Sequence, residues 1–181
     1  MSALDTVARS AAPTTIRPPA SPGSMNVDWE ERVNPDRLRS YRLGRARDAL
    51  AASDVGALLL FDFNNIRYVT STHIGEWARD KMTRFALLTR GGQPHLWDFG
   101  SAAKHHRLYC PWLPPENVRG GMIGLRGAVA PQAGLFKRAA REIAEILRAE
   151  GVAGMPVGVD IVEPPMLAAL EAEGISVRDG Q

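Results

Sequence analysis

Residues 64–71 have the sequence Asn-Asn-Ile-Arg-Tyr-Val-Thr-Ser, and their polar side chains directly follow an apolar run at 57–61. α/β proteins place binding residues at this end of a buried strand. Here Asn64 can cap a short helix, Arg67 can bind a carboxylate through two parallel hydrogen bonds, and Tyr68 can pack with its hydroxyl outward. Packing of Tyr68 beside a solvated Arg67 explains the same residues, so a binding site and a core segment both stay open.

The polar segment that follows adds a second set of candidates: His73, Glu76, Trp77, Arg79 and Asp80. Trp77 is a large apolar side chain among charged neighbours, which is typical of an interface anchor, although packing on its own sheet is an equal alternative. Glu76 and Asp80 would share one face of a helix and, with His73, would form a small acid–base set. The same spacing is common on solvated helices, so it does not by itself indicate catalysis.

The remaining reactive side chains form no recognisable site. Cys110 is the single cysteine, which excludes an internal disulfide and fits a reducing compartment. His105 and His106 are adjacent and would diverge by about 100° on a helix, so they could not share a metal ion without a distant third ligand. We therefore expect this chain to hold no catalytic residue, no metal ion and no other cofactor of its own.

Apolar periodicity predicts alternating helices and strands. Residues 135–150 form the strongest helix, with one apolar stripe and a charged opposite face. The runs at 57–61 and 157–162 indicate strands buried on both faces. Together these elements predict an α/β fold, a mixed β-sheet flanked by helices on both faces. The other expected elements are a helix from Asn34-Pro35 to about 53, a hairpin of strands 84–89 and 94–97, a loop over 111–132, a helix over 164–173 and a strand over 175–177.

Composition limits the class of protein. The 181 residues suffice for one domain, expected over 27–181, preceded by an Ala-, Pro-, Ser- and Thr-rich tail at 1–26 that should be disordered. The 22 basic and 20 acidic residues interleave, and a net charge of +2 is too small to indicate nucleic-acid binding. No apolar run is long enough to cross a membrane, and the N-terminus lacks the apolar stretch of a secretion signal. We expect a cytoplasmic protein.

The buried strand, the Asn-Ile-Arg-Tyr-Val-Thr segment and the hairpin after it resemble the N-terminal domain of the creatinase, prolidase and aminopeptidase P family, the pita-bread metallohydrolases. The resemblance continues through the helix at 135–150, the Val-Gly-Val-Asp strand from 157 and the last helix and strand, and it covers about 34–181. Residues 72–82 look most similar to the branch that contains dimethylsulfoniopropionate lyase.

The resemblance implies a division of roles between two domains. In this family a C-terminal catalytic domain, absent from these 181 residues, holds a pair of divalent metal ions through Asp, His and Glu side chains. The N-terminal domain is non-catalytic; it supports a homodimer or larger homo-oligomer and completes a partner subunit's substrate pocket. The positions that match this second role are Arg67, Tyr68, His73, Trp77 and Arg79. The intact parent would be a metal-dependent hydrolase of the Xaa-Pro peptidase type or a related lyase.

The alternative is a stand-alone module that reuses the same fold. In that case Arg67, Trp77 and Arg79 would recognise a small carboxylate or a partner protein. Peptides, guanidino compounds and sulfonium zwitterions all stay open as substrates of the intact protein, because the discriminating residues would lie in the catalytic domain.

Overall fold

The computed structural model describes residues 33–75, 84–122 and 130–181. The chain divides into two compact units, Met1–Leu38 and Arg39–Gln181. The described part of the first unit begins helix α1 (Pro35–Ala52), whose first turn is capped as the sequence predicts: the Asn34 side chain accepts a hydrogen bond from the Arg37 amide at 2.9 Å. The predicted tail at 1–26 lies outside the described residues.

The second unit is built around a six-stranded sheet with the order β4-β3-β2-β1-β5-β6. β1 pairs with β2 in antiparallel and with β5 in parallel orientation, so the sheet is mixed, as predicted. β3 runs antiparallel to β2, while β4 and β6 run parallel to their neighbours at the two edges. The strands are β1 (Ala57–Leu60), β2 (Phe85–Thr89), β3 (His95–Asp98), β4 (Val118–Gly120), β5 (Val157–Val159) and β6 (Val177–Asp179).

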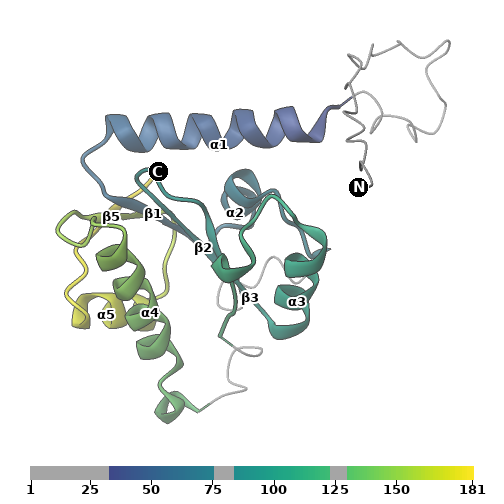
Figure 1. Cartoon of the computed structure of the whole chain (residues 1–181). Coiled ribbons are helices and arrows are strands. Elements are labelled where there is room, and N and C mark those ends of the chain that lie inside the picture. The colour runs from purple at the N-terminus through teal and green to yellow at the C-terminus, as the bar shows by residue number, and fades with distance from the viewer. Residues whose placement is uncertain (1–32, 76–83, 123–129) are drawn as a thin grey trace, which may run out of the picture. The chain divides into compact units, whose positions relative to one another are not determined.

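Helices cover both faces of this sheet (Figure 1). α4 (Leu135–Ala149) and α5 (Pro164–Ala172) pack on one face. α2 (Phe63–Thr70) and α3 (Gly100–Tyr109) pack on the other, together with the part of α1 that belongs to the second unit. Among residues 33–75, 84–122 and 130–181, no helix is both long enough and apolar enough to span a bilayer.

Each central strand contributes to two apolar clusters, because successive side chains point to opposite faces. In β1, Leu59 packs in the cluster that contains Ile143 of α4 and Met166 of α5, whereas Leu60 packs in the cluster that contains Ile66 of α2. All of these side chains are buried. The continuous apolar runs of the sequence therefore reflect a sheet that is covered on both sides, as expected.

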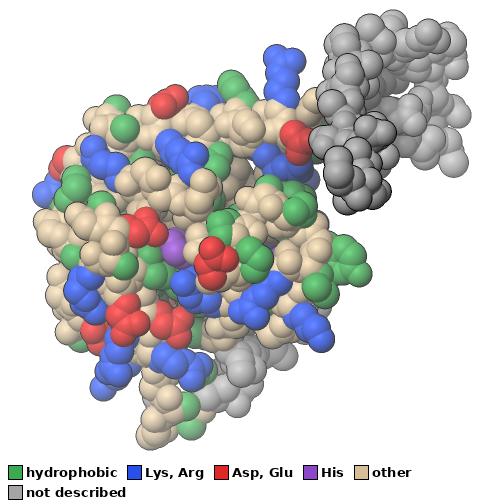
Figure 2. Space-filling model, viewed as in Figure 1, with side chains coloured by type: hydrophobic (Ala, Val, Ile, Leu, Met, Phe, Trp, Pro, Cys, Tyr) green, Lys and Arg blue, Asp and Glu red, His purple; other side chains and the backbone are tan. Residues whose placement is uncertain are grey.

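Charged side chains on the surface are mixed in sign. On the face shown in Figure 2, basic and acidic groups alternate, most densely over α4, and neither sign forms a continuous area. This arrangement follows from the helix itself: Lys137, Arg141, Glu145 and Arg148 are exposed on the side opposite its buried stripe. Glu142, predicted on the same side, is half-buried instead and accepts a hydrogen bond from Trp97 Nε1 at 2.8 Å.

The structure corrects the sequence prediction at several places. No element was predicted for 98–110, yet α3 occupies most of that stretch, and the predicted loop at 111–132 contains edge strand β4. β5 ends at Val159 rather than at 162, because the Asp160 carboxylate accepts hydrogen bonds from the backbone amides of Phe61 and Ile161. The last strand is Val177–Asp179 instead of 175–177.

Candidate functional site

Residues 64–70 of the predicted segment lie in α2, which begins at Phe63 just beyond the carboxyl end of β1, and Ser71 is its C-cap. Its cap is Asp62 rather than the predicted Asn64: the Asp62 Oδ1 atom accepts hydrogen bonds from the amides of Asn64 at 2.8 Å and Asn65 at 3.3 Å. Asp62 has the extended backbone conformation of an N-cap residue (φ −71°, ψ 132°), whereas Asn64 already lies inside the helix. The aspartate therefore fixes the direction in which α2 leaves the sheet.

Asp160 joins the carboxyl ends of the two parallel strands β1 and β5. Its Oδ1 accepts hydrogen bonds from the amides of Phe61 at 2.8 Å and Ile161 at 2.7 Å. Its Oδ2 accepts from the Asp62 amide and from the Asn65 side-chain amide, both at 3.0 Å. A carboxylate with four donors is fully satisfied, so Asp160 serves as a structural clamp under this edge of the sheet.

β1 and β5 are neighbouring parallel strands, and the chain leaves them toward opposite faces of the sheet. After β1 the chain enters α2 on one face, and after β5 it enters α5 on the other. Such a switch point opens a crevice beyond the strand ends, where α/β proteins bind ligands. A pocket of about 530 Å³ lies here. Its polar lining comes from Asp62, Asn65, Tyr68, Asp160 and Gln181, and its apolar lining from Ala46, Leu58, Leu60, Val69 and Ile161.

The predicted site residues on α2 point to different surroundings. Arg67 is exposed, and Tyr68 is half-buried in the wall of the pocket, with the Arg42 guanidinium carbon 5.7 Å from its ring centroid. His73 is exposed in the segment after the helix. Trp77 and Arg79 lie outside the described residues, as do Glu76 and Asp80 of the acid–base hypothesis. The structure thus brings Tyr68 to the pocket and leaves Arg67 and His73 on the surface.

A cluster of buried polar side chains connects the two ends of the segment that carries His73. Ser71 closes α2 in the left-handed conformation (φ 53°), and Thr72 returns to the interior. Arg84, immediately before β2, has no exposed side-chain surface; its Nη2 donates to Thr72 Oγ1, and its Nε lies 3.0 Å from Asp98 Oδ2. The two ends of residues 73–83 are therefore linked by one side-chain contact.

The same cluster continues into α3. The second polar contact of Asp98 Oδ2 is with His106 Nε2 at 3.1 Å, and His106 Nδ1 lies 3.6 Å from Cys110 Sγ. Burial raises the pKa of the Cys110 thiol, although Arg39 and Arg84 oppose that shift, so the thiol stays protonated at neutral pH and is a poor nucleophile. Burial also lowers the pKa of Arg84, and Asp98 counteracts it. Asp, His and Cys side chains in this order also occur in catalytic sites. Because the Cys110 thiol stays protonated here, we interpret the cluster as structural.

Sequence reasoning missed this cluster, although one feature of the sequence points to it. Arg84 and Asp98 flank apolar strand residues on β2 and β3, and a charged side chain next to a doubly buried strand requires a partner of opposite charge. The partner in α3, His106, could not be placed because that helix was not predicted. His105 takes no part in the cluster. It is exposed, its ring centroid lies 4.7 Å from that of Tyr109, and its ring meets the buried ring of His106 edge-on at 5.8 Å.

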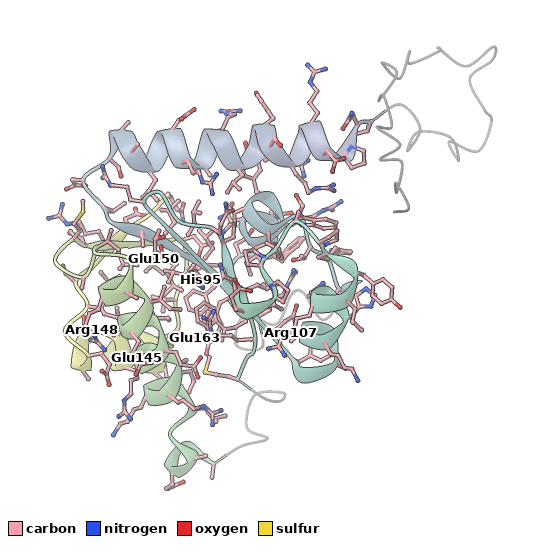
Figure 3. All side chains as sticks on the ribbon, in the orientation of Figure 1. His95, Arg107, Glu145, Arg148, Glu150 and Glu163 are labelled. Atoms are coloured by element: carbon pink, nitrogen blue, oxygen red, sulfur yellow. The ribbon has the colours of Figure 1, made fainter. Side chains whose placement is uncertain are left out.

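A second polar network lies on the opposite face, between β3 and α4. His95 Nε2 lies 2.8 Å from Glu150 Oε1, and Arg119 Nη1 approaches His95 Nδ1 at 3.0 Å; Figure 3 shows His95 and Glu150 side by side. Thr89 donates to the other oxygen of Glu150. Burial lowers the pKa of His95, the hydrogen bond with Glu150 opposes this, and Arg119 adds to it. His95 is therefore a neutral ring that donates through Nε2 and accepts through Nδ1.

The described residues contain no group of three or more His, Cys, Asp and Glu side chains placed to hold a metal ion. Asp62 and Asp160 are close at the switch point, but the carboxylate of Asp160 is engaged with backbone and amide donors. This edge of the sheet therefore presents hydrogen-bond acceptors and the aromatic ring of Tyr68 above apolar side chains.

The fold is one that is known from solved structures. A proline dipeptidase from Streptococcus agalactiae superposes with a TM-score of 0.50 at 12% identity, and the match covers 77% of this chain and 92% of that one. The mixed six-stranded sheet and its helices are those of the creatinase/prolidase N-terminal domain, as the sequence resemblance predicted. A comparison with protein-family profiles finds no match.

Sequence similarity then points to particular relatives. The chain is 30% identical over 155 residues to dimethylsulfoniopropionate lyase DddP of Roseovarius nubinhibens, and 31% identical over 154 residues to DddP of Roseobacter denitrificans. Each match covers 80% of this chain and 32% of the relative. The chain therefore spans about a third of the length of the curated relatives that it matches. Its similarity to the branch that contains dimethylsulfoniopropionate lyase is confirmed.

Proposed function

We propose that this chain is the non-catalytic N-terminal domain of a larger metal-dependent enzyme of the pita-bread type, either an Xaa-Pro peptidase or a related lyase. The observation that carries the proposal is the match to DddP, which uses most of this chain and only 32% of the relative. The catalytic metal pair would be held by a separate domain, in the cytoplasm. Within this domain, Asp160 and the Arg84–Asp98 pair act as structural anchors rather than as reacting groups.

The proposed role is to build a homodimer and to complete the substrate pocket of the partner subunit. Arg67 and His73 support this role because both are exposed on the chain that follows the carboxyl end of β1. The contact between Thr72 and Arg84 joins the two ends of residues 73–83. Trp77 and Arg79 lie outside the described residues and stay predicted positions for this role. An exposed arginine on a rigid helix suits recognition of a carboxylate across a subunit boundary.

Activity assays test the non-catalytic part of this proposal. We expect the purified 181-residue chain, supplied with Mn²⁺, Fe²⁺ or Zn²⁺, to cleave neither an Xaa-Pro dipeptide nor dimethylsulfoniopropionate. Metal-dependent turnover of either compound, removed by a chelator and restored by the metal, would contradict it. The reading frame beyond Gln181 should continue and encode spaced Asp, His and Glu residues.

Light scattering coupled to size-exclusion chromatography tests the assembly role. We expect a dimer whose dissociation constant rises about tenfold or more in Arg67→Glu, because the reversed charge would face the partner subunit. Arg138→Glu is the matched control, since Arg138 is exposed on α4, on the other face of the sheet. A monomer at all concentrations, together with a stop codon after Gln181, would favour a stand-alone binding module in which Arg67 recognises a carboxylate.

A further inference from the structure

The pocket at the switch point has features that its structural role does not explain. Its volume of about 530 Å³ falls in the range of small-molecule sites, roughly 300–1,000 Å³. It lies where the chains after β1 and β5 diverge, which is where open α/β sheets bind ligands. Neither Asp160 nor the cap made by Asp62 requires an open space of this size.

Three acceptor groups in the lining have no partner among the described residues. Asp62 uses only Oδ1 for its cap, and Asn65, which is exposed, uses only its Nδ2 group on Asp160. The Tyr68 hydroxyl has no hydrogen bond to another described residue, although Arg45 interacts with Tyr68 electrostatically. All three side chains come from the turn after β1 and from α2, so one rigid element positions them. They therefore form a preorganised set of acceptors around one side of the pocket.

The charged side chains in the lining indicate which class of ligand the pocket would bind. Asp62 and Asp160 contribute two carboxylates, and no Lys or Arg is among the lining residues. Arg42, whose guanidinium lies 5.7 Å from the Tyr68 ring centroid, and Arg45, which interacts electrostatically with Tyr68, approach this side chain without entering the lining, so the negative charge that faces the pocket comes from the two aspartates. A ligand that donates hydrogen bonds and carries positive charge would satisfy the open acceptors, while Leu58, Leu60 and Val69 would contact an apolar group.

We propose that this pocket binds a small organic cation, an ammonium or guanidinium group carried on a short branched hydrocarbon. The charged group contacts Asp62 and the open oxygens of Asn65 and Tyr68. The hydrocarbon lies on the apolar floor between α1, β1 and α2. The site shares Tyr68 with the positions predicted for the domain role, but it uses neither Arg67 nor His73, so the two proposals can be tested separately.

A ligand series with one hydrocarbon and three head groups tests the proposal on the 181-residue chain. The probes are 3-methylbutylamine, 3-methylbutan-1-ol and 4-methylpentanoate at pH 7, titrated while amide chemical shifts are followed by NMR. We expect the amine to bind at least about tenfold more tightly than the alcohol, because a charge-assisted hydrogen bond is worth roughly 1.5–3 kcal/mol. The carboxylate should not bind, and the shifts should concentrate at Asn65, Tyr68 and Gly180.

Asp62→Asn is the decisive variant, because Asn caps a helix as well as Asp does and removes only the charge. It should lose about tenfold in amine affinity and leave the alcohol unchanged, whereas Glu145→Gln, an exposed change on α4, should alter neither. Equal affinity of the amine and the alcohol for the wild-type chain would overturn the proposal, and so would full amine affinity in the Asp62 variant. Failure here would leave the dimerisation result unaffected, which separates the two proposals.

Discussion

Arg84 and Asp98 form an ion pair in which neither side chain has any exposed surface. Arg84 Nε lies 3.0 Å from Asp98 Oδ2, but the geometry of this contact is not that of a hydrogen bond, so the attraction between the two groups is ionic. Arg84 Nη1 also has no hydrogen-bond partner among the described residues. Removing one member of such a pair leaves an uncompensated charge in a medium that solvates it poorly. We therefore expect Asp98→Asn to lower the free energy of unfolding by about 3–5 kcal/mol in urea denaturation at pH 7.

The control for this prediction is an ion pair of the same charges on the surface. Arg178 and Asp54 are in contact, but their side chains are 55% and 71% exposed. Water and salt screen such a pair, so Asp54→Asn should cost less than about 1 kcal/mol. Similar losses for the two variants would mean that the Arg84–Asp98 pair is compensated by groups other than its partner.

His95 should make stability depend on pH in a defined direction. Because its pKa is lowered in the folded chain, the unfolded chain binds the proton more tightly, and stability falls as pH drops below the ordinary value of about 6.5. Glu150 and Arg119 are the charged groups that contact the ring. His95→Gln keeps a donor for Glu150 and an acceptor for Arg119, and it cannot titrate.

The measurement is the urea midpoint of both proteins at pH 7.5 and pH 5.5. We expect the wild-type midpoint to fall by more than that of His95→Gln, so that the difference between the two proteins narrows or reverses at the lower pH. Parallel losses in both proteins would assign the acid sensitivity to groups other than His95.

The contact between β5 and β6 depends on two glycines. A methyl group at Gly180 would come within 2.7 Å of the backbone of Gly158 and Val159, which cannot move without shifting the strand pair. Gly180→Ala should therefore destabilise the chain by about 1–3 kcal/mol in urea. Gly120 is the matched control, because a methyl group there meets no atom within 4 Å, and Gly120→Ala should change stability by less than about 0.5 kcal/mol.

Elements with a strong apolar pattern were predictable from the sequence, and those held by polar contacts were not. α4 has six buried residues along one stripe, and β1 and β5 are continuous apolar runs, so their burial follows from composition alone. α3 buries two alanines and His106, which gives no apolar stripe to detect. β4 is a three-residue edge strand in a Pro- and Gly-rich stretch, and only its pairing with β3 defines it.

The candidate site was predictable in location but not in its contacts. The rule that binding residues follow a buried strand led from 57–61 to α2 and to Tyr68, which lines the pocket. Asp62 and Asp160 were not singled out, because their meeting depends on the parallel pairing of strands about a hundred residues apart. A local sequence pattern does not show which distant strands pair in parallel, because such strands are joined by a long crossover connection.

The two apolar clusters should unfold together, because they share the same strands. Leu59 and Leu60 are neighbours in β1, yet they pack in different clusters, and β2 alternates in the same way. Loss of either cluster would expose one side of strands that support the other, which makes partial unfolding of one face unfavourable. The unit Arg39–Gln181 should therefore behave as a single cooperative unit.

Tryptophan fluorescence can test this with one reporter on each face. Trp97 is buried in the cluster under α4, and Trp112 packs on the cluster beside α2 and α3. In a background with Trp29→Phe and Trp77→Phe, the further change Trp112→Phe leaves Trp97 alone, and Trp97→Phe leaves Trp112 alone. In each protein we expect the urea midpoint by fluorescence to coincide with the midpoint by far-UV circular dichroism. A fluorescence transition well below the circular dichroism transition in one of them would show that its face of the sheet opens independently.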